Sequence, residues 1–451
     1  MRVQLAGGIQ ALVAALIVWT ALGASSVWPW NIPVGRTMRW VVLAELAAFA
    51  LLYVWLRPRR EVRLSAWVAL AMALPALAVL SALWSPVPGL TAGRALTVAA
   101  LFIAAGAVTY GVGASAERRA QILLGILAGC VVVAVFGLLN LWADVDRATV
   151  PATIGTPVRY NGLGGNPNTM SMLLALAVPL SIWAFLESGK RGKVAAAAAF
   201  VLLDGSIVAS GSRGAILGAF TGILVLGLAL GNRRQVLAVA GFAVLVLAVN
   251  AALTQVPQPA DKDPILNPEF GAREPIGPAD AQFILPLESE IDFPGLGAAA
   301  KQRRLFETSG RLTAWSGALE QAAERPVVGY GFGTEERAFV DRYYNFTAER
   351  VENAYVAMAL QLGVVGVALL LAFLGLTAVR GVQLVCSLDG YARRVTAAAL
   401  GVFAAGLVLG GTQSFMTSVG SAATAPFWLA TFLLGGATLA SARAARAHRT
   451  S

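Results

Sequence analysis

The run AYVAMALQLGVVGVALLLAFLGLTAV, residues 354–379, decides the fold, because it contains no charged side chain over a length that can cross a bilayer. An apolar α-helix of about 20 residues spans the hydrocarbon core. Glu352 precedes the run and Arg380 follows it, so a charged group marks each end. The run therefore predicts a transmembrane helix.

Similar runs recur along the chain and account for its composition. Apolar residues make up 57% of the 451 residues and charged residues 13%, with a mean hydropathy of +0.71. A soluble domain carries about 25% charged residues, and one such domain could not bury this much apolar surface. We predict an all-α polytopic membrane protein with about twelve transmembrane helices. The runs lie near residues 4–24, 37–56, 64–84, 94–112, 120–142, 169–188, 193–210, 214–231, 234–256, 354–379, 394–415 and 421–441.

Basic residues decide the expected direction of insertion. With twelve spans, one side of the membrane receives Arg2, Arg57, Arg59, Arg60, Arg63, Arg118, Arg119, Lys190, Arg191, Lys193, Arg233, Arg234, Arg380, Arg393, Arg394, Arg443, Arg446 and Arg449. Cytoplasmic loops are enriched in lysine and arginine, so both termini are expected in the cytoplasm. The net charge of +10 follows largely from this bias, and no nucleic-acid partner is needed to explain it.

This topology divides the chain into three parts. Residues 1–256 would hold nine helices, residues 257–353 one large loop on the periplasmic or extracellular face, and residues 354–451 three helices and a cytoplasmic tail. The first half of the loop is rich in proline and should be irregular. The second half predicts a short helix capped by Ser309 and ended by Pro326, followed by a glycine-rich turn over 327–333.

Histidine and cysteine chemistry is restricted. The single histidine, His448, lies in the C-terminal tail, which excludes histidine-based metal sites and histidine general bases. Cys130 and Cys386 lie within or close to apolar runs, and we expect both to be buried small side chains.

Two arginines stand out among the residues expected at the outer face. Arg213 lies in the tight link between two apolar runs, where an arginine either has a function or extends its side chain to the interface. Arg311 begins the loop helix, where a guanidinium and free backbone N–H groups together make an anion site. The alternative for Arg311 is a solvated surface charge.

Two further polar clusters are expected at the same face. Glu352, Asn353 and Tyr355 lie where the loop re-enters the membrane; Glu352 either favours the helix dipole or acts as a base. Arg159, with Asn166 and Asn168, precedes the span near 169–188 and forms either a binding group or a structural turn.

Together these residue types suggest a diphosphate on a lipid carrier as substrate. Arginine binds phosphate oxygens through two parallel hydrogen bonds and stays charged. No acidic metal cluster is evident in the sequence, so the arginines could replace Mg²⁺ as the charge clamp, and no cofactor is expected.

Several motifs resemble the O-antigen ligase and Wzy-type polysaccharide polymerase superfamily. They are Leu83-Trp84-Ser85-Pro86, Arg159 through Asn168, Gly211-Ser212-Arg213-Gly214-Ala215, Ser309-Gly310-Arg311-Leu312-Thr313-Ala314-Trp315, Arg325-Pro326 with the glycine turn, and Glu352-Asn353-Ala354-Tyr355 through Gly366. Each motif is short, but they occur in family order over about 80–370, which is most of the chain.

The resemblance implies a membrane glycosyltransferase of the GT-C type in the bacterial cytoplasmic (inner) membrane. Such an enzyme takes glycan from undecaprenyl diphosphate and transfers it, with inversion and without metal, to an acceptor hydroxyl. Arg213, Arg311 and Glu352 would be catalytic, and Arg159, Asn166, Asn168, Asn353 and Tyr355 would bind substrate. Many members of the family carry histidine where this chain has Glu352. A carboxylate can serve as the base in its place.

Three functions follow as alternatives. The main one is a polymerase that joins lipid-linked repeat units, with a glycan or lipid-linked acceptor and a chain-length regulator as a partner. A ligase would instead move the finished glycan to lipid A core or protein. A transporter or flippase for the same lipid would place its polar residues near mid-membrane in broken helices, often in two related halves.

Overall fold

The computed structural model describes residues 2–25, 37–38, 40–48, 52, 65–111, 115–150, 158–231, 311–335, 351–418 and 420–447. The predicted span near 234–256, most of the loop over 257–353, the cap Ser309 and the tail residue His448 lie outside these residues. The predicted span near 37–56 lies only partly within them.

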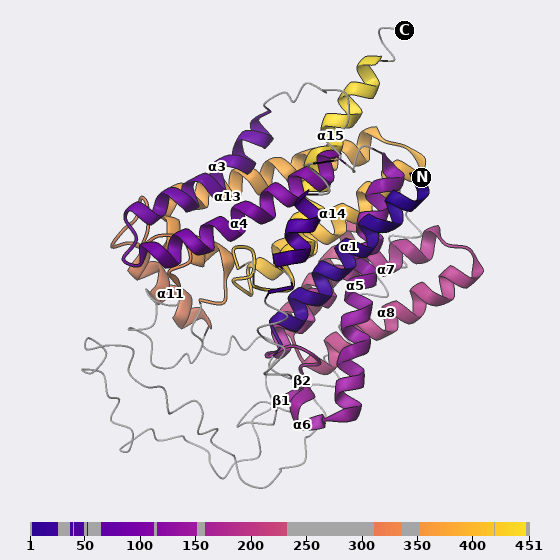
Figure 1. Cartoon of the computed structure of the whole chain (residues 1–451), viewed down its shortest axis with the longest axis horizontal. Helices are drawn as coiled ribbons and strands as arrows, with labels where there is room; N and C mark the ends of the chain where they lie inside the picture. The colour runs from indigo at the N-terminus through magenta and orange to yellow at the C-terminus, as the bar shows by residue number, and fades with distance from the viewer. Residues whose placement is uncertain are drawn as a thin grey trace.

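Helices make up nearly all of the described chain (Figure 1). They are α1 (Arg2–Gly23), α3 (Ala66–Leu80), the 3-10 helix η1 (Ser81–Leu83), α4 (Pro88–Gly111), α5 (Ala116–Ala143), α6 (Val145–Ala148), α7 (Pro167–Glu187), α8 (Lys190–Ser210), α9 (Arg213–Leu230), α11 (Arg311–Ala322), α13 (Ala354–Ser387), α14 (Gly390–Gly410) and α15 (Thr424–Ala447). Two short antiparallel strands, β1 (Thr149–Val150) and β2 (Arg159–Tyr160), pair with each other.

The described helices confirm a helical protein that crosses the membrane several times. Eight helices within the described ranges are long and apolar enough to span a bilayer, and two shorter apolar helices cover Gly8–Gly23 and Thr424–Gly436. The run near 193–210 forms α8 although Asp204 and Gly205 interrupt it. The total of twelve spans stays a prediction.

Small residues let the central helices pack closely. α14 packs against α7, α9 and α13. At the crossing of α9 and α14, a Cβ added to Gly222 would lie 2.8 Å from the carbonyl oxygen of Gly401, so neither helix could approach as closely with a larger residue there. This is the packing expected of helices in lipid, where van der Waals contact rather than the hydrophobic effect holds them together.

An aromatic cluster joins α3, α4, α13 and α15. The rings of Trp67 and Phe373 lie 5.2 Å apart, those of Phe102 and Trp428 4.6 Å apart, and Phe432 contacts Trp67 edge-on. The Trp67 indole also donates a hydrogen bond to Thr377 Oγ1 at 2.8 Å. Aromatic pairs of this kind contribute about 0.5–1.5 kcal/mol beyond area burial, so the cluster fixes how these four helices lie.

The two cysteines differ in exposure. Cys130 is buried, as predicted, whereas Cys386 is exposed near the end of α13, so the prediction for Cys386 is wrong. An apolar neighbourhood in sequence does not decide which face of a helix a residue occupies.

The helix α13 is broken at Gly363, and the glycine-rich turn fills the break. Gly363 has φ +60° and ψ −161°, outside the helical region. Leu360 and Gln361 accept hydrogen bonds on their carbonyl oxygens from the N–H groups of Tyr330 and Gly331, at 3.0 and 2.8 Å. In return, Val364 N donates to Pro326 O at 2.8 Å. The turn and the helix therefore satisfy each other's backbone groups.

Gly363→Ala is expected to separate the turn from α13 and lower stability by at least about 1–3 kcal/mol. An added Cβ would lie 2.4 Å from the backbone of Val327, and the positive φ disfavours alanine independently. Thermal unfolding of the purified protein measures the loss. Gly375→Ala, also in α13 but with no atom within 4 Å of the added Cβ, is the matched control. Equal melting temperatures for the two variants would contradict this account of the break.

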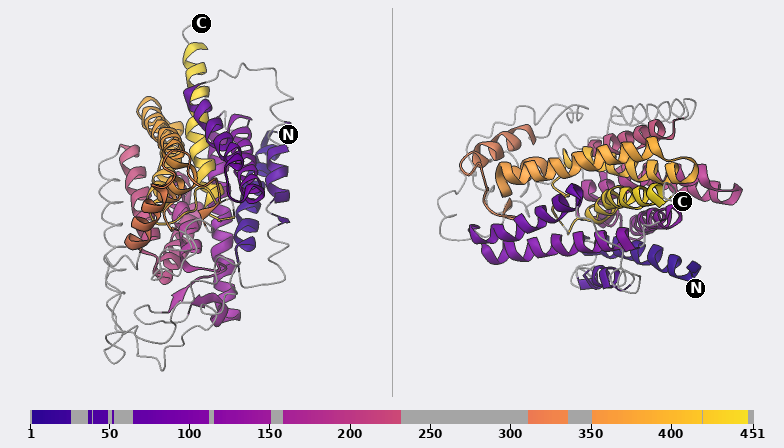
Figure 2. Two further views of the ribbon diagram at one scale, coloured as in Figure 1. Left: turned by 90° about the vertical axis from the view of Figure 1, so that its left-hand side faces the viewer. Right: turned by 90° about the horizontal axis from the view of Figure 1, so that it is seen from above.

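The helix bundle has two distinct ends. The start of α1 and the end of α15 lie toward one end, whereas α11, β1 and β2 lie toward the other (Figures 1 and 2). The positive-inside pattern predicts that the first end is cytoplasmic.

Cysteine labelling tests this direction. In a Cys386→Ser background, an impermeant thiol reagent added to spheroplasts should label Asp146→Cys in α6 and not Lys190→Cys at the start of α8. Both positions are exposed, and the remaining Cys130 is buried. If only Lys190→Cys were labelled, the protein would have the opposite orientation in the membrane.

Candidate active site

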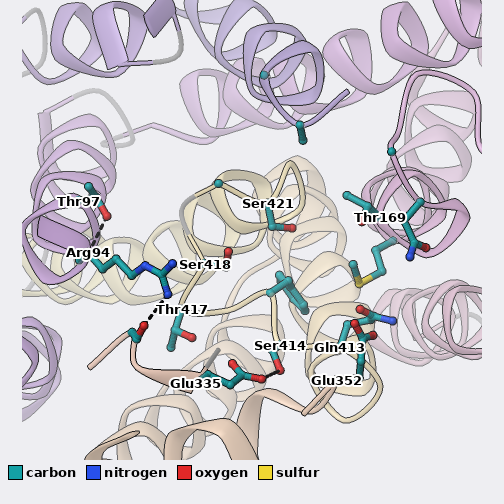
Figure 3. A pocket seen from close by; sticks show the side chains of 18 of the residues that line it. Arg94, Thr97, Thr169, Glu335, Glu352, Gln413, Ser414, Thr417, Ser418 and Ser421 are labelled. Carbon is teal, nitrogen blue, oxygen red and sulfur yellow. Dashed lines mark hydrogen bonds between the residues drawn. The ribbon is translucent and has the colours of Figure 1, made fainter. Parts of the chain in front are cut away.

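A polar cavity of about 580 Å³ lies where α4, α7, the glycine-rich turn, the start of α13 and the segment 413–421 meet (Figure 3). Its hydroxyl groups come from Thr97, Thr169, Ser414, Thr417, Ser418 and Ser421. Its amides are Asn166, Gln361 and Gln413, and its charged residues are Arg94, Glu335 and Glu352. Dense hydroxyl and amide groups with few charges suit a ligand with many hydroxyl groups.

Glu352 lines the cavity and carries an unusual backbone. Its φ is +56°, and it is the one non-glycine residue of the described chain in the left-handed region. Such a conformation costs about 1–3 kcal/mol and persists only where the surroundings fix it. Its side chain is 20% exposed, so the carboxylate is mostly enclosed yet still reaches the cavity.

Arg311 lies beside Glu352. Its Nη2 is 3.6 Å from the Glu352 Oε2, and its side chain is 23% exposed. It begins α11, as predicted, and α11 is held against the start of α13 by Ala314 and Ala318, both fully buried, and by a hydrogen bond from the Trp315 indole to Val351 O at 3.0 Å. Arg311 is therefore too enclosed to be the solvated surface charge that was the alternative in the sequence analysis.

The predicted cluster around Arg159 is brought together by direct hydrogen bonds. Arg159 Nε donates to Ser210 O and its Nη2 to Asn168 Oδ1, both at 2.7 Å. Asn166 caps α7 by accepting from Asn168 N at 2.8 Å, and it also lines the cavity. Arg159 therefore joins the end of α8 to the start of α7, next to the cavity.

Arg213 is not among the residues that line the cavity. It begins α9, and at the next position a Cβ added to Gly214 would lie 2.6 Å from Thr412 Oγ1. Thr412 directly precedes Gln413 and Ser414 in the cavity wall. The start of α9 therefore packs against Thr412, the residue before this segment of the cavity wall.

Asn353 and Tyr355 make hydrogen bonds that hold the start of α13. Asn353 Oδ1 accepts from Tyr355 N at 3.0 Å and from Val356 N at 3.2 Å, which caps the helix. The Tyr355 hydroxyl donates to Leu407 O at 2.8 Å and ties α13 to α14. Contact of either residue with substrate stays a prediction.

Two parts of the cavity wall were not singled out from the sequence. Glu335 follows the glycine-rich turn by two residues and is 5% exposed. The segment 413–421 supplies four hydroxyl groups from a short polar interruption between two apolar runs. That interruption was a usable signal, because polar residues that face the interior of a membrane helix bundle often mark a functional site.

Comparison with known protein families gives a match over part of the chain. Residues 197–371 match the family described as O-Antigen ligase. No curated protein matches the sequence. The matched range begins in α8 and ends in α13, and it contains Arg213, Arg311 and Glu352. The family resemblance predicted from the sequence motifs is confirmed.

Proposed function

From this family match, we propose that the chain is a membrane glycosyltransferase that polymerises oligosaccharide repeat units carried on undecaprenyl diphosphate. The observation that carries the proposal is the ion pair between Arg311 and Glu352, in which Glu352 lines a polar cavity. Arg311, as a cation that can bind a diphosphate, then lies beside Glu352, as a carboxylate that can accept a hydroxyl proton.

The proposed reaction needs only these groups. The acceptor hydroxyl oxygen attacks the anomeric carbon, and the bond from that carbon to the diphosphate oxygen breaks, with inversion. Glu352 takes the hydroxyl proton. Arg311 and Arg213 stabilise the charge that develops on the leaving diphosphate, which is the larger catalytic contribution in such sites. No metal or cofactor takes part in this proposal.

The cavity wall supports binding of glycan on both sides of the reacting atoms. Thr417, Ser418 and Ser421 offer donors and acceptors to the acceptor sugar. Asn166 faces the same space, and Arg159 with Asn168 holds the start of α7 in place. Asn353 and Tyr355 would contribute by positioning α13.

The enzyme would lie in the bacterial cytoplasmic membrane, with cytoplasmic termini and the cavity on the outer face. This is where undecaprenyl-linked glycan is available after export. A chain-length regulator would be a partner of a polymerase.

A ligase is the second candidate, favoured by the description of the matched family. It would use the same donor and residues but transfer the glycan to lipid A core or to protein.

A transporter is less well supported. The break in α13, a feature of transporters, is filled by backbone groups of the glycine-rich turn, and Arg94, Glu335 and Glu352 lie at one cavity.

Reconstitution separates these functions. Vesicles with purified protein and an undecaprenyl-diphosphate-linked repeat unit should yield a ladder of longer lipid-linked products. New product only after addition of lipid A core or an acceptor protein would favour the ligase. Movement of the lipid across the bilayer without any new glycosidic bond would overturn the transferase proposal.

A further inference from the structure

We propose that Glu335 is a positioning residue, whose buried carboxylate fixes the backbone of the residues on both sides of Glu352 and so sets where the Glu352 carboxylate lies. This inference rests on the proposed base role of Glu352. Glu335 belongs to none of the motifs quoted from the sequence.

The first contacts connect Glu335 to the residues that flank Glu352. Glu335 Oε1 accepts a hydrogen bond from Val351 N at 2.5 Å and from the Ser414 hydroxyl at 2.9 Å. Ser414 Oγ in turn accepts from Asn353 N at 3.1 Å. One carboxylate oxygen therefore holds the N–H of Val351 directly and the N–H of Asn353 through the Ser414 hydroxyl. Glu335 and Ser414 lie next to each other in Figure 3.

A second set of contacts fixes Glu335 itself. Gln361 Nε2 donates to Glu335 Oε2 at 3.4 Å, and Gln361 Oε1 accepts from Gly333 N at 2.8 Å. Glu335, Gln361 and Ser414 are 5%, 2% and 7% exposed. Buried polar groups of this kind are expensive to leave without partners, so the network has one favoured arrangement.

The backbone of Glu352 explains why such a network is needed. A φ of +56° is unfavourable for glutamate, and the chain would relax to negative φ if the flanking peptides could turn. Val351 N donates to Glu335, and Val351 O accepts from the Trp315 indole. Asn353 N donates to the Ser414 hydroxyl. Relaxation at Glu352 would break at least one of these bonds.

The expected signature is a lower kcat with an unchanged KM. A reacting group displaced by about 1 Å can cost about 10²-fold in rate. We expect Glu335→Ala to lower kcat per folded molecule by about that factor. Ser414→Ala, which breaks only the link to Asn353, should lower it less, and Glu335→Gln, which keeps one acceptor oxygen, should retain the most activity. The acidic limb of the rate–pH profile should move in Glu335→Ala, because the surroundings of the Glu352 carboxylate change.

The test uses the purified full chain in vesicles with an undecaprenyl-diphosphate-linked repeat unit. Melting curves give the folded fraction for each variant. Glu324→Gln is the matched control, because Glu324 is exposed and bonds the Tyr330 hydroxyl away from the cavity. It should leave kcat, KM and the pH profile unchanged.

Several results would overturn the inference. If Glu335→Ala lowers only the folded fraction and keeps the wild-type kcat and pH profile, Glu335 is merely structural. If KM rises with kcat unchanged, Glu335 contacts substrate and does not act through Glu352. Should Glu335→Ala fail to fold, Ser414→Ala decides between the same outcomes. Absence of transfer by the wild-type protein contradicts the proposed function itself, which is a separate result.

Discussion

Glu352→Gln is expected to lower turnover by about 10²–10⁴-fold while donor binding survives. Glutamine keeps the shape of the side chain and its capacity for hydrogen bonds, but its amide cannot act as a base. Glu352 is the carboxylate that lies both on the cavity wall and 3.6 Å from Arg311. Turnover of the lipid-linked repeat unit, corrected for folded protein, measures the effect, and donor binding is measured separately.

Glu352→His is the informative companion, because it restores the residue common among the similar transferases. Partial activity with a pH optimum moved toward the histidine range would support a shared base role. If Glu352 only favours the dipole of α13, Glu352→Gln should cost about 0.3–1 kcal/mol of stability and leave turnover near wild type. That result would remove Glu352 from the mechanism.

Arg311→Ala is expected to cost about 10²–10³-fold in rate, or about 3–4 kcal/mol, because in the proposed reaction Arg311 stabilises the charge on the leaving diphosphate. Arg311→Lys should rescue poorly, since an ammonium group cannot make two parallel hydrogen bonds to phosphate. Polymer yield and length in cells, with kcat in vesicles, measure the loss.

The ion pair between Arg311 and Glu352 makes a double variant useful. If the two groups act together, Arg311→Ala combined with Glu352→Gln should cost much less than the sum of the single losses. Arg325→Ala is the control, because Arg325 is exposed and its guanidinium lies 4.7 Å from the Tyr330 ring centre. Normal polymer length and yield in Arg311→Ala would argue that its charge has no part in the reaction.

The sequence alone determined most of the helices, because length and hydropathy are local properties. The run over 354–379 is contained in α13, and the weakest run, near 193–210, forms α8 despite Asp204. The helix that starts at Arg311 also followed from the sequence, since the spacing of its apolar residues is a local signal. The family resemblance rested on short motifs in order, and it too needed no structure.

Contacts between distant segments were decided only by the tertiary structure. Nothing near Glu335 in the sequence indicates that Ser414, 79 residues away, would donate to it, or that the two would hold the peptide around Glu352. The break at Gly363 needs the turn at Val327 to fill it. Hydropathy fixes which segments lie in the membrane, whereas the site depends on how the helices pack, and that packing is set by close contacts such as Gly222 with Gly401.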